Sequence, residues 1–112
     1  MKITRHFLES TDRYNFDFKA CTYALGWAQV DTKQDASYFG TWANPRKRTI
    51  LNYAEGDVTI SVAATDAEFA EGLREIDRWN ITNGYGPARI DPGYDPAMKA
   101  DFEAIGLADL LH

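Results

Sequence analysis

The chain has 112 residues, of which 45% are apolar and 26% are charged, and its formal net charge is -5. This length is typical of one domain with one hydrophobic core, so we expect a single domain over residues 1–112. The apolar fraction argues against intrinsic disorder. The acidic balance disfavours a general nucleic-acid binder, because polyphosphate repels negative charge. An acidic protein either suits a basic surface of another protein or is simply soluble.

The first residues, MKITRHFLES, contain no apolar run of the length that a signal peptide needs. No stretch approaches the roughly 20 apolar residues of a membrane helix. Cys21 is the only cysteine, which excludes an internal disulfide and a zinc site built from cysteines. These features predict a cytoplasmic protein that binds no membrane.

The first two thirds of the chain have the pattern of β-strands. Lys2–Leu8 is rich in β-compatible residues and predicts a first or edge strand. In Tyr14–Ala20 apolar and polar residues alternate, which predicts a half-buried strand. Further strand-like runs, broken by an Asn-Pro turn and by EGD, predict an antiparallel meander from about Gly26 to Ala64. Its last strand, VTISVAA, places Val58, Ile60 and Val62 on one face.

The hydrophobic period then changes to that of a helix. Thr65 and Glu68 have the spacing of a capping box, in which each side chain bonds a backbone N–H left unpaired at the helix start. Phe69, Leu73 and Ile76 follow on one helical face that should lie on the sheet. The pattern predicts a main helix over residues 65–80.

The remainder of the chain predicts a loop and a second helix. Residues 81–95 are dense in glycine, proline and other turn formers. Asp95 before Pro96 is typical of a helix start, which places a C-terminal helix at 96–112 with Gly106 as a stop. The expected fold is therefore α+β, an antiparallel sheet of five or six strands packed against one main helix, with a second helix at the C-terminus.

Residue types that carry catalysis are sparse. Cys21 and His6 are the only internal cysteine and histidine, and each falls in or beside an expected strand, where structural roles are the norm. Asp91 and Asp95 lack the ligand pattern of a calcium loop and fit a turn and a helix cap better. The segment NGYGP lacks a phosphate-binding fingerprint. We therefore expect no enzyme, no cofactor and no metal.

The acidic side chains of the expected sheet have a structural interpretation as well. Paired carboxylates for acid and base catalysis could come from Asp17, Asp31 and Glu55. Exposed carboxylates on the polar face of a sheet are normal, however, and no spacing distinguishes these three. Tyr85, in the expected loop, is a reasonable contact residue because tyrosine offers large area at little entropic cost.

The segment YFGTWANPRKRT, Tyr38–Thr49, combines three aromatic rings with three consecutive cations. Rings and cations beside a sheet are typical of single-stranded nucleic-acid binders, but no RNA-recognition motif is present. Gly40 indicates a bulge or a close approach, and at least one ring belongs to the core.

The three cations of this segment, Arg46, Lys47 and Arg48, leave three interpretations open. They form a solvated basic turn, contact another protein, or contact nucleic acid. Glu55 or Asp57, across the next turn, should neutralise part of their charge.

The strings DTKQDASYFGTWANP, YAEGD and DRW resemble small uncharacterised proteins carried by bacterial plasmids and phages. The resemblance covers about the middle half of the chain. It implies a mobile genetic element as the setting and carries over no catalytic residue.

These observations support two functional hypotheses. The first is a non-enzymatic accessory or inhibitor protein that binds another protein, as a monomer or homodimer. The alternative is a single-stranded nucleic-acid binder that uses the hairpin 38–48. The residues expected to contact the partner are Trp42, Arg46, Lys47, Arg48 and Tyr85.

Overall fold

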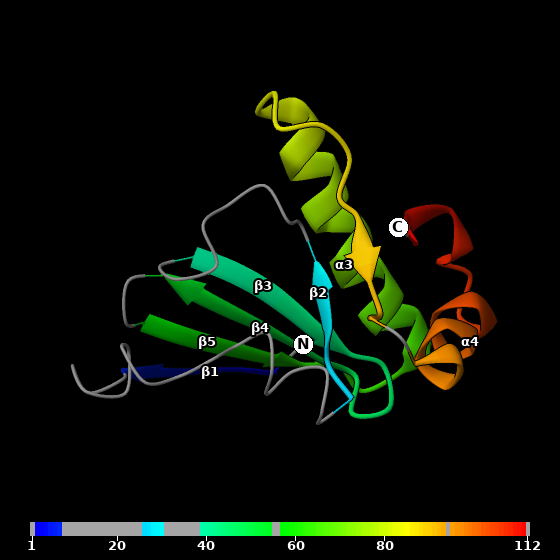
Figure 1. Cartoon of the computed structure of the whole chain (residues 1–112). Helices are drawn as coiled ribbons and strands as arrows, with labels where there is room; N and C mark the ends of the chain where they lie inside the picture. Colours follow the sequence, from blue (N-terminus) through cyan, green and yellow to red (C-terminus); the bar gives the residue numbers. More distant parts are fainter. Residues whose placement is uncertain (1, 8–25, 31–38, 55–56, 94, 112) are drawn as a thin grey trace.

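A computed structural model describes residues 2–7, 26–30, 39–54, 57–93 and 95–111 of the chain. Its sheet has six strands in the order β1-β5-β4-β3-β2-β6, and every neighbouring pair is antiparallel. With helices α3 and α4 this confirms the α+β class (Figure 1). The strands are β1 Lys2–Phe7, β2 Ala28–Val30, β3 Phe39–Asn44, β4 Thr49–Ala54, β5 Asp57–Val62 and β6 Ile90–Asp91. The strand expected at residues 14–20 lies outside the described residues.

Strands β2 to β5 form the expected meander. The β3–β4 ladder runs without interruption from Phe39 opposite Ala54 to Asn44 opposite Thr49, so Gly40 makes no bulge in it. Gly40 instead allows a close approach, because a Cβ at this position would lie 2.1 Å from Cη2 of Trp42. The indole ring therefore lies directly against the glycine backbone.

Helix α3, Asp66–Thr82, begins with the predicted cap. The backbone N–H of Glu68 donates to Oγ1 of Thr65 at 3.1 Å. The carboxylate of Glu68 in turn accepts from the N–H of Ala64 at 3.2 Å. Two backbone donors before and within the first turn are thus satisfied by side chains. The helix ends two residues later than expected.

Helix α4, Pro96–Ala104, also begins as predicted, because the carboxylate of Asp95 accepts from the N–H of Ala97 at 2.9 Å. The helix ends well before the expected residue 112. Gly106 has a φ of 84°, a left-handed conformation that stops an α-helix. A short 3-10 helix, η1 Ala108–Leu110, follows it.

The expected loop 81–95 contains a strand that the sequence did not predict. In β6, Ile90 pairs with Val30 and Asp91 pairs with Gln29 of β2. The side chain of Ile90 is buried in the core. The carboxylate of Asp91 then accepts from the N–H of Gly93 at 2.9 Å, which is the expected turn rather than a metal site.

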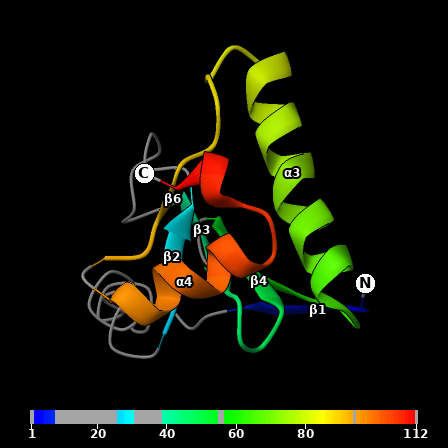
Figure 2. The same ribbon diagram turned by 90° about the vertical axis from the view of Figure 1, so that its right-hand side faces the viewer.

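Both helices pack on one face of the sheet. Figure 2 shows α4 in front of β2 and β6 and α3 to the right of these strands, and α3 contacts β4. Phe69 and Leu73 of α3 and Phe102 of α4 are completely buried there. Each such side chain contributes about 1.5–3 kcal/mol through the apolar surface that it removes from water. The predicted apolar face of α3 is thereby confirmed, since Ile76 also packs against this core.

The opposite face of the sheet carries a smaller apolar cluster. Trp42 is completely buried in it, and Trp27, Leu51 and Ile60 pack against the indole ring. Ile60 of the predicted apolar face of β5 therefore points away from the helices.

A side-chain clamp joins α3 to the C-terminal turn. The guanidinium of Arg74 donates to both carboxylate oxygens of Asp109, at 3.1 and 2.9 Å, and to the carbonyl of Gly106 at 2.8 Å. The hydrogen bond from Arg74 holds the pKa of Asp109 below its ordinary value, and the same bond raises the pKa of Arg74. The clamp fixes the chain after α4 against the middle of α3.

Within the described residues, no helix has the length and apolarity required to cross a membrane.

Candidate functional site

The turn that joins β3 and β4, residues 45–48 and here called the basic turn, is held by its own hydrogen bonds. The side chain of Asn44 accepts from the N–H of Lys47 at 3.1 Å, and the hydroxyl of Thr49 donates to the carbonyl of Lys47 at 2.7 Å. Arg48 has a φ of 48°, in the left-handed region. Its carbonyl accepts from the N–H of Ala63 at 2.8 Å, so the turn is tied to the segment before α3.

Two of the three cations in the basic turn are bound to carboxylates of the helices. Nε of Arg46 donates to Asp101 of α4 at 2.9 Å, and Nε of Arg48 donates to Asp66 of α3 at 2.8 Å. The expected partners were Glu55 or Asp57; Glu55 lies outside the described residues, and the side chain of Asp57 is not described. The basic turn therefore fastens the sheet to the first turn of α3 and to the second turn of α4. Lys47 is exposed to solvent.

Trp42 does not belong to the surface. Its side chain is 0% exposed, with the ring folded over Gly40 and packed on the apolar cluster behind the sheet. The structure thus corrects the prediction that Trp42 contacts a partner, because an enclosed ring has no area to offer. The related expectation that at least one ring of the segment belongs to the core is confirmed.

Tyr85 lies at the other end of α3, next to a residue that the sequence did not single out. Its ring stacks on that of Trp79, with centroids 5.7 Å apart and an interplanar angle of 22°. Trp79 is 55% exposed and Tyr85 is 47% exposed. We call this pair the aromatic end.

The backbone fixes the geometry of the aromatic end. The N–H of Gly84 donates to the carbonyl of Ile81 at 3.2 Å, and the N–H of Tyr85 donates to the carbonyl of Asn80 at 2.9 Å. With the positive φ of 79° at Gly84, this is a Schellman motif, and the ring pair is the side-chain contact that commonly accompanies it. The Asn-Gly pair followed by Tyr85, six residues after Trp79, is the sequence signal that identifies such an end.

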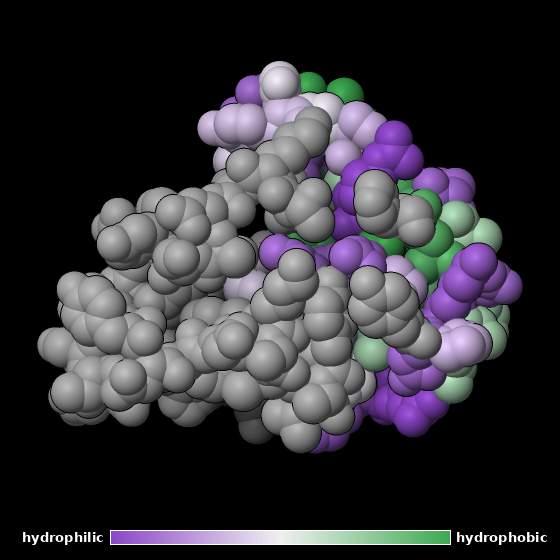
Figure 3. All heavy atoms as spheres, in the orientation of Figure 1, coloured by the Kyte–Doolittle hydropathy of each residue, from purple (hydrophilic) through white to green (hydrophobic). Residues whose placement is uncertain are grey.

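The aromatic end projects from the body of the molecule. Figure 1 shows the last turns of α3 and the following loop extending beyond the strands. Figure 3 shows a few strongly hydrophobic atoms among mostly hydrophilic ones at the top of the molecule, over this part of α3. Ile81 is a further exposed apolar residue here, 55% exposed. It lies on the other side of the helix from Trp79, because two residues turn an α-helix by about 200°.

The basic turn and the aromatic end do not form one surface. Arg48 is bound to Asp66, the first residue of α3, whereas Tyr85 follows its last turn. A helix of 17 residues spans about 25 Å. The structure thus brings Arg46, Lys47 and Arg48 together and leaves Tyr85 far from them.

Groups considered for catalysis lie mostly outside the described residues, among them Cys21, Asp17 and Asp31. His6 is in β1, where its side chain is not described. Across the ranges that the structure does describe, no three His, Cys, Asp or Glu side chains gather in a way that would hold a metal ion.

The geometry of the aromatic end and of the basic turn is the basis for a functional interpretation, because comparison with known proteins adds none. No protein-family model, no curated protein and no solved structure matches this chain.

Proposed function

We propose that this protein is a non-enzymatic accessory or inhibitor protein that binds another protein through the aromatic end, Trp79 and Tyr85. The observation that carries the proposal is a stacked pair of rings, each about half exposed, on a helix end that projects from the molecule. Tryptophan and tyrosine are the side chains most enriched among the residues that dominate binding energy at protein interfaces. Their exposed apolar area is removed from water when a partner covers it.

The rings are fixed before any partner arrives. The Schellman bonds at Gly84 and Tyr85 set the backbone, and the stacking sets the two side chains. Immobilising a side chain at an interface costs about 0.5–1.5 kcal/mol, and a preorganised pair avoids most of that cost. The aromatic end is therefore suited to be a contact anchor.

Exposure of the rings is not a requirement of the helix stop. Helix α4 ends in the same motif, with the N–H of Gly106 bonded to Glu103 and that of Leu107 bonded to Phe102. There Leu107, at the position that corresponds to Tyr85, is 0% exposed. The helix stop thus explains why two rings pack together at the end of α3. It does not explain why they are exposed to solvent, and contact with a partner does.

The basic turn supports a protein partner over single-stranded nucleic acid. Arg46 and Arg48 are bound to carboxylates, which compete with phosphate for them, and Trp42 has no face on which a base can stack. The net charge of -5 adds long-range repulsion. Tyr38 lies outside the described residues.

We place this activity in the cytoplasm and in the setting of a bacterial plasmid or phage. The single cysteine agrees with a reducing compartment. The setting rests on the resemblance of the segments at 31–45, 53–57 and 77–79.

The test is quantitative capture from a bacterial lysate, with mass spectrometry to identify and count the retained proteins. The wild-type chain is compared with Trp79→Ala and Tyr85→Ala, and Ile81→Ala is the matched control because Ile81 is equally exposed on the other side of the same turn. We expect each ring variant to lower recovery of a specific partner at least about tenfold, the effect of about 1.4 kcal/mol. Equal recovery by wild type and both ring variants, with all chains folded by circular dichroism, would contradict the proposal.

A further inference from the structure

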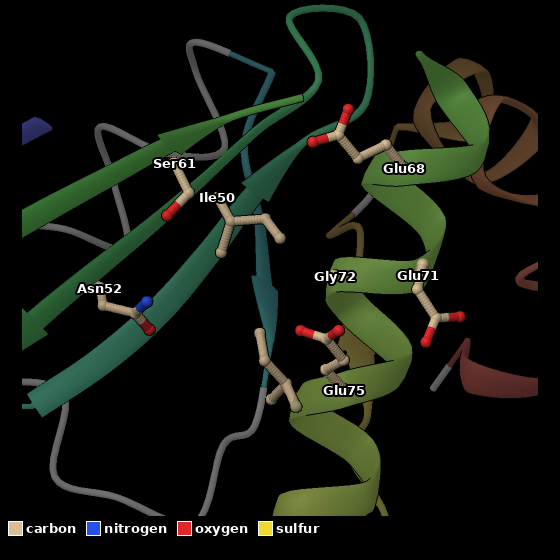
Figure 4. Close-up of a pocket in the computed structure, with 8 residues that line it drawn as sticks. Ile50, Asn52, Ser61, Glu68, Glu71, Gly72 and Glu75 are labelled. Carbon is tan, nitrogen blue, oxygen red and sulfur yellow. The ribbon is translucent and has the colours of Figure 1, made fainter. Parts of the chain in front are cut away.

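A groove separates α3 from the strands β4 and β5. It has a volume of about 440 Å³, within the range of sites that bind ligands. Figure 4 shows its two walls, with Ile50, Asn52 and Ser61 on the strands and glutamates on the helix. The lining residues are Ile50, Asn52, Ser61, Glu68, Glu71, Gly72, Glu75 and Ile76. We call this feature the acidic groove.

Three of the eight residues that line the acidic groove are glutamates, and none of the eight is basic. Hydrogen bonds from the amino terminus of the chain and from the N–H of Ala64 lower the pKa of Glu68. Glu71 points away from the strands in Figure 4 and is bound to Arg78. Glu75 directs its carboxylate toward the strands, and it makes no ion pair within the described part of the chain. The carboxylate of Glu75 therefore attracts a cationic ligand over a range of about 8 Å at physiological ionic strength.

The floor of the groove is apolar and open to close approach. Ile50 and Ile76 line it from the two sides. Gly72 of α3 also lines the groove, although glycine is the least favourable residue after proline for a helix interior. Because Gly72 carries no side chain, the wall of the groove at this position is the backbone of α3.

The acidic groove and Trp79 lie on the same side of α3. Trp79 is seven positions after Gly72, which is nearly two turns of helix, so the two residues share one helical face about 10 Å apart. A ligand that covers Trp79 is therefore positioned to enter the groove.

We propose that the acidic groove receives a basic segment of the partner protein, in which a Lys or Arg neighbours apolar residues. This inference rests on the proposed function and names the chemistry of the partner. The apolar side chains of the segment pack on Ile50 and Ile76 over Gly72, and its cation lies beside Glu75. The sign of the charge and the apolar floor together select this occupant over an acidic or a purely polar one.

The first test uses two defined probes on the full chain. One is a fluorescein-labelled hexapeptide of alternating Lys and Val, blocked at both ends, and the other replaces each Lys by Glu. We expect the Lys peptide to raise fluorescence anisotropy and to shift the backbone amide resonances of Asn52, Ser61 and Gly72 in the NMR spectrum. No binding of the Lys peptide at millimolar concentration, equal binding of the Glu peptide, or resonance shifts confined to other parts of the chain would overturn the inference.

The second test uses variants of the groove itself. Gly72→Leu fills the floor and improves helix propensity, so it should block the Lys peptide while the chain stays folded. Glu75→Lys should weaken binding about tenfold or more, a change of about 1.4 kcal/mol. Glu103→Lys, on the exposed side of α4, makes the same change in net charge and should leave affinity within about twofold. Equal affinity of the Glu75 and Glu103 variants, or unchanged binding by Gly72→Leu, would overturn the inference.

The two proposals fail in different ways. If Trp79→Ala loses the partner and Gly72→Leu fully retains it, the proposed function stands. The acidic groove then takes no part in binding that partner. Binding of the Lys peptide in the groove, without any captured partner, supports the groove and contradicts the aromatic end. A dimer detected by light scattering that Gly72→Leu dissociates would assign the groove to a second copy of the chain and overturn the inference.

Discussion

The β3–β4 hairpin and the C-terminal end of α3 each present a tryptophan close to basic residues, and the fold uses the two in opposite ways. Trp42 is 0% exposed behind the basic turn, and Trp79 is 55% exposed at the aromatic end. The cations beside Trp42 are bound to Asp66 and Asp101 of the helices. A cluster of rings and cations in a sequence therefore does not by itself identify a contact surface. The core of the fold can enclose the ring, and carboxylates of neighbouring helices can bind the cations.

The two ends of α3 differ in the same way, because one is bonded within the fold and the other is exposed. The N-terminal end is bonded to the sheet through Arg48 and to its own cap through Thr65. The C-terminal end is closed by backbone bonds at Gly84 and Tyr85 and extends beyond the strands. One end holds the fold together, and the other offers surface.

The largest expected effect distinguishes the two tryptophans by one substitution. Trp42→Ala should lower the free energy of unfolding by about 3–5 kcal/mol, the usual cost of truncating a large buried ring. Trp79→Ala should lower it by about 1 kcal/mol or less, because its ring is half exposed. Urea denaturation followed by far-ultraviolet circular dichroism measures both values.

Gly40→Ala serves as an independent check on the buried tryptophan. A methyl group at this position would lie 2.1 Å from the indole ring, so the variant should also destabilise the chain strongly. Equal stability of the Trp42 and Trp79 variants would remove the distinction between the two regions.

A smaller effect is expected from the cap that begins α3. Thr65→Ala should cost about 1 kcal/mol, because the N–H of Glu68 loses its side-chain acceptor. Thr82→Ala, the same change in the last residue of the helix, should be close to neutral. Thermal unfolding of both variants gives the comparison, and a cost at Thr82 as large as that at Thr65 would argue against a stabilising cap.

Charge reversal in the basic turn should have a still smaller effect on stability. Arg46→Glu and Arg48→Glu each break an exposed ion pair, and such pairs contribute about 0.2–1 kcal/mol. Lys47→Glu makes the same charge change at an exposed position of the same turn and is the control. Urea midpoints should fall for the two arginine variants and not for the lysine variant. If the arginine variants lose partner capture while their urea midpoints stay unchanged, the basic turn is part of the contact surface.

The smallest expected effect concerns acid pH. Because the hydrogen bond from Arg74 lowers the pKa of Asp109 in the folded chain, this carboxylate stabilises the fold above its ordinary pKa of 3.8. That contribution is lost as the pH falls through the lower folded value. Asp109→Asn should therefore be less stable than wild type at pH 7, and the difference should shrink below pH 3.8. A difference that stays constant with pH in urea titrations would argue against the ion pair.

Much of the local structure could be predicted from the sequence because its signals are local. The helix cap at Thr65, the helix start at Asp95 and the stop at Gly106 each depend on residues within four positions. The alternating strands of the meander depend on a period of two and were predicted for the same reason. Strand β6 escaped prediction because two residues, Ile90 and Asp91, are too short for any period.

The site was harder to predict because it depends on contacts between distant segments. The carboxylates that bind Arg48 and Arg46 are 18 and 55 residues further along the chain. No spacing rule identifies such partners. Tyr85 was correctly placed in the segment after the helix, but its stacking on Trp79 required knowledge that α3 continues to Thr82.

The central claim, that contact occurs at the end of α3 and not at the basic turn, is tested most directly by amide hydrogen exchange in the complex with the captured partner. We expect binding to slow exchange at the last turn of α3 and through Tyr85, and to leave residues 44–49 unchanged. Slower exchange at residues 44–49, with the segment from Trp79 to Tyr85 unaffected, would contradict the account.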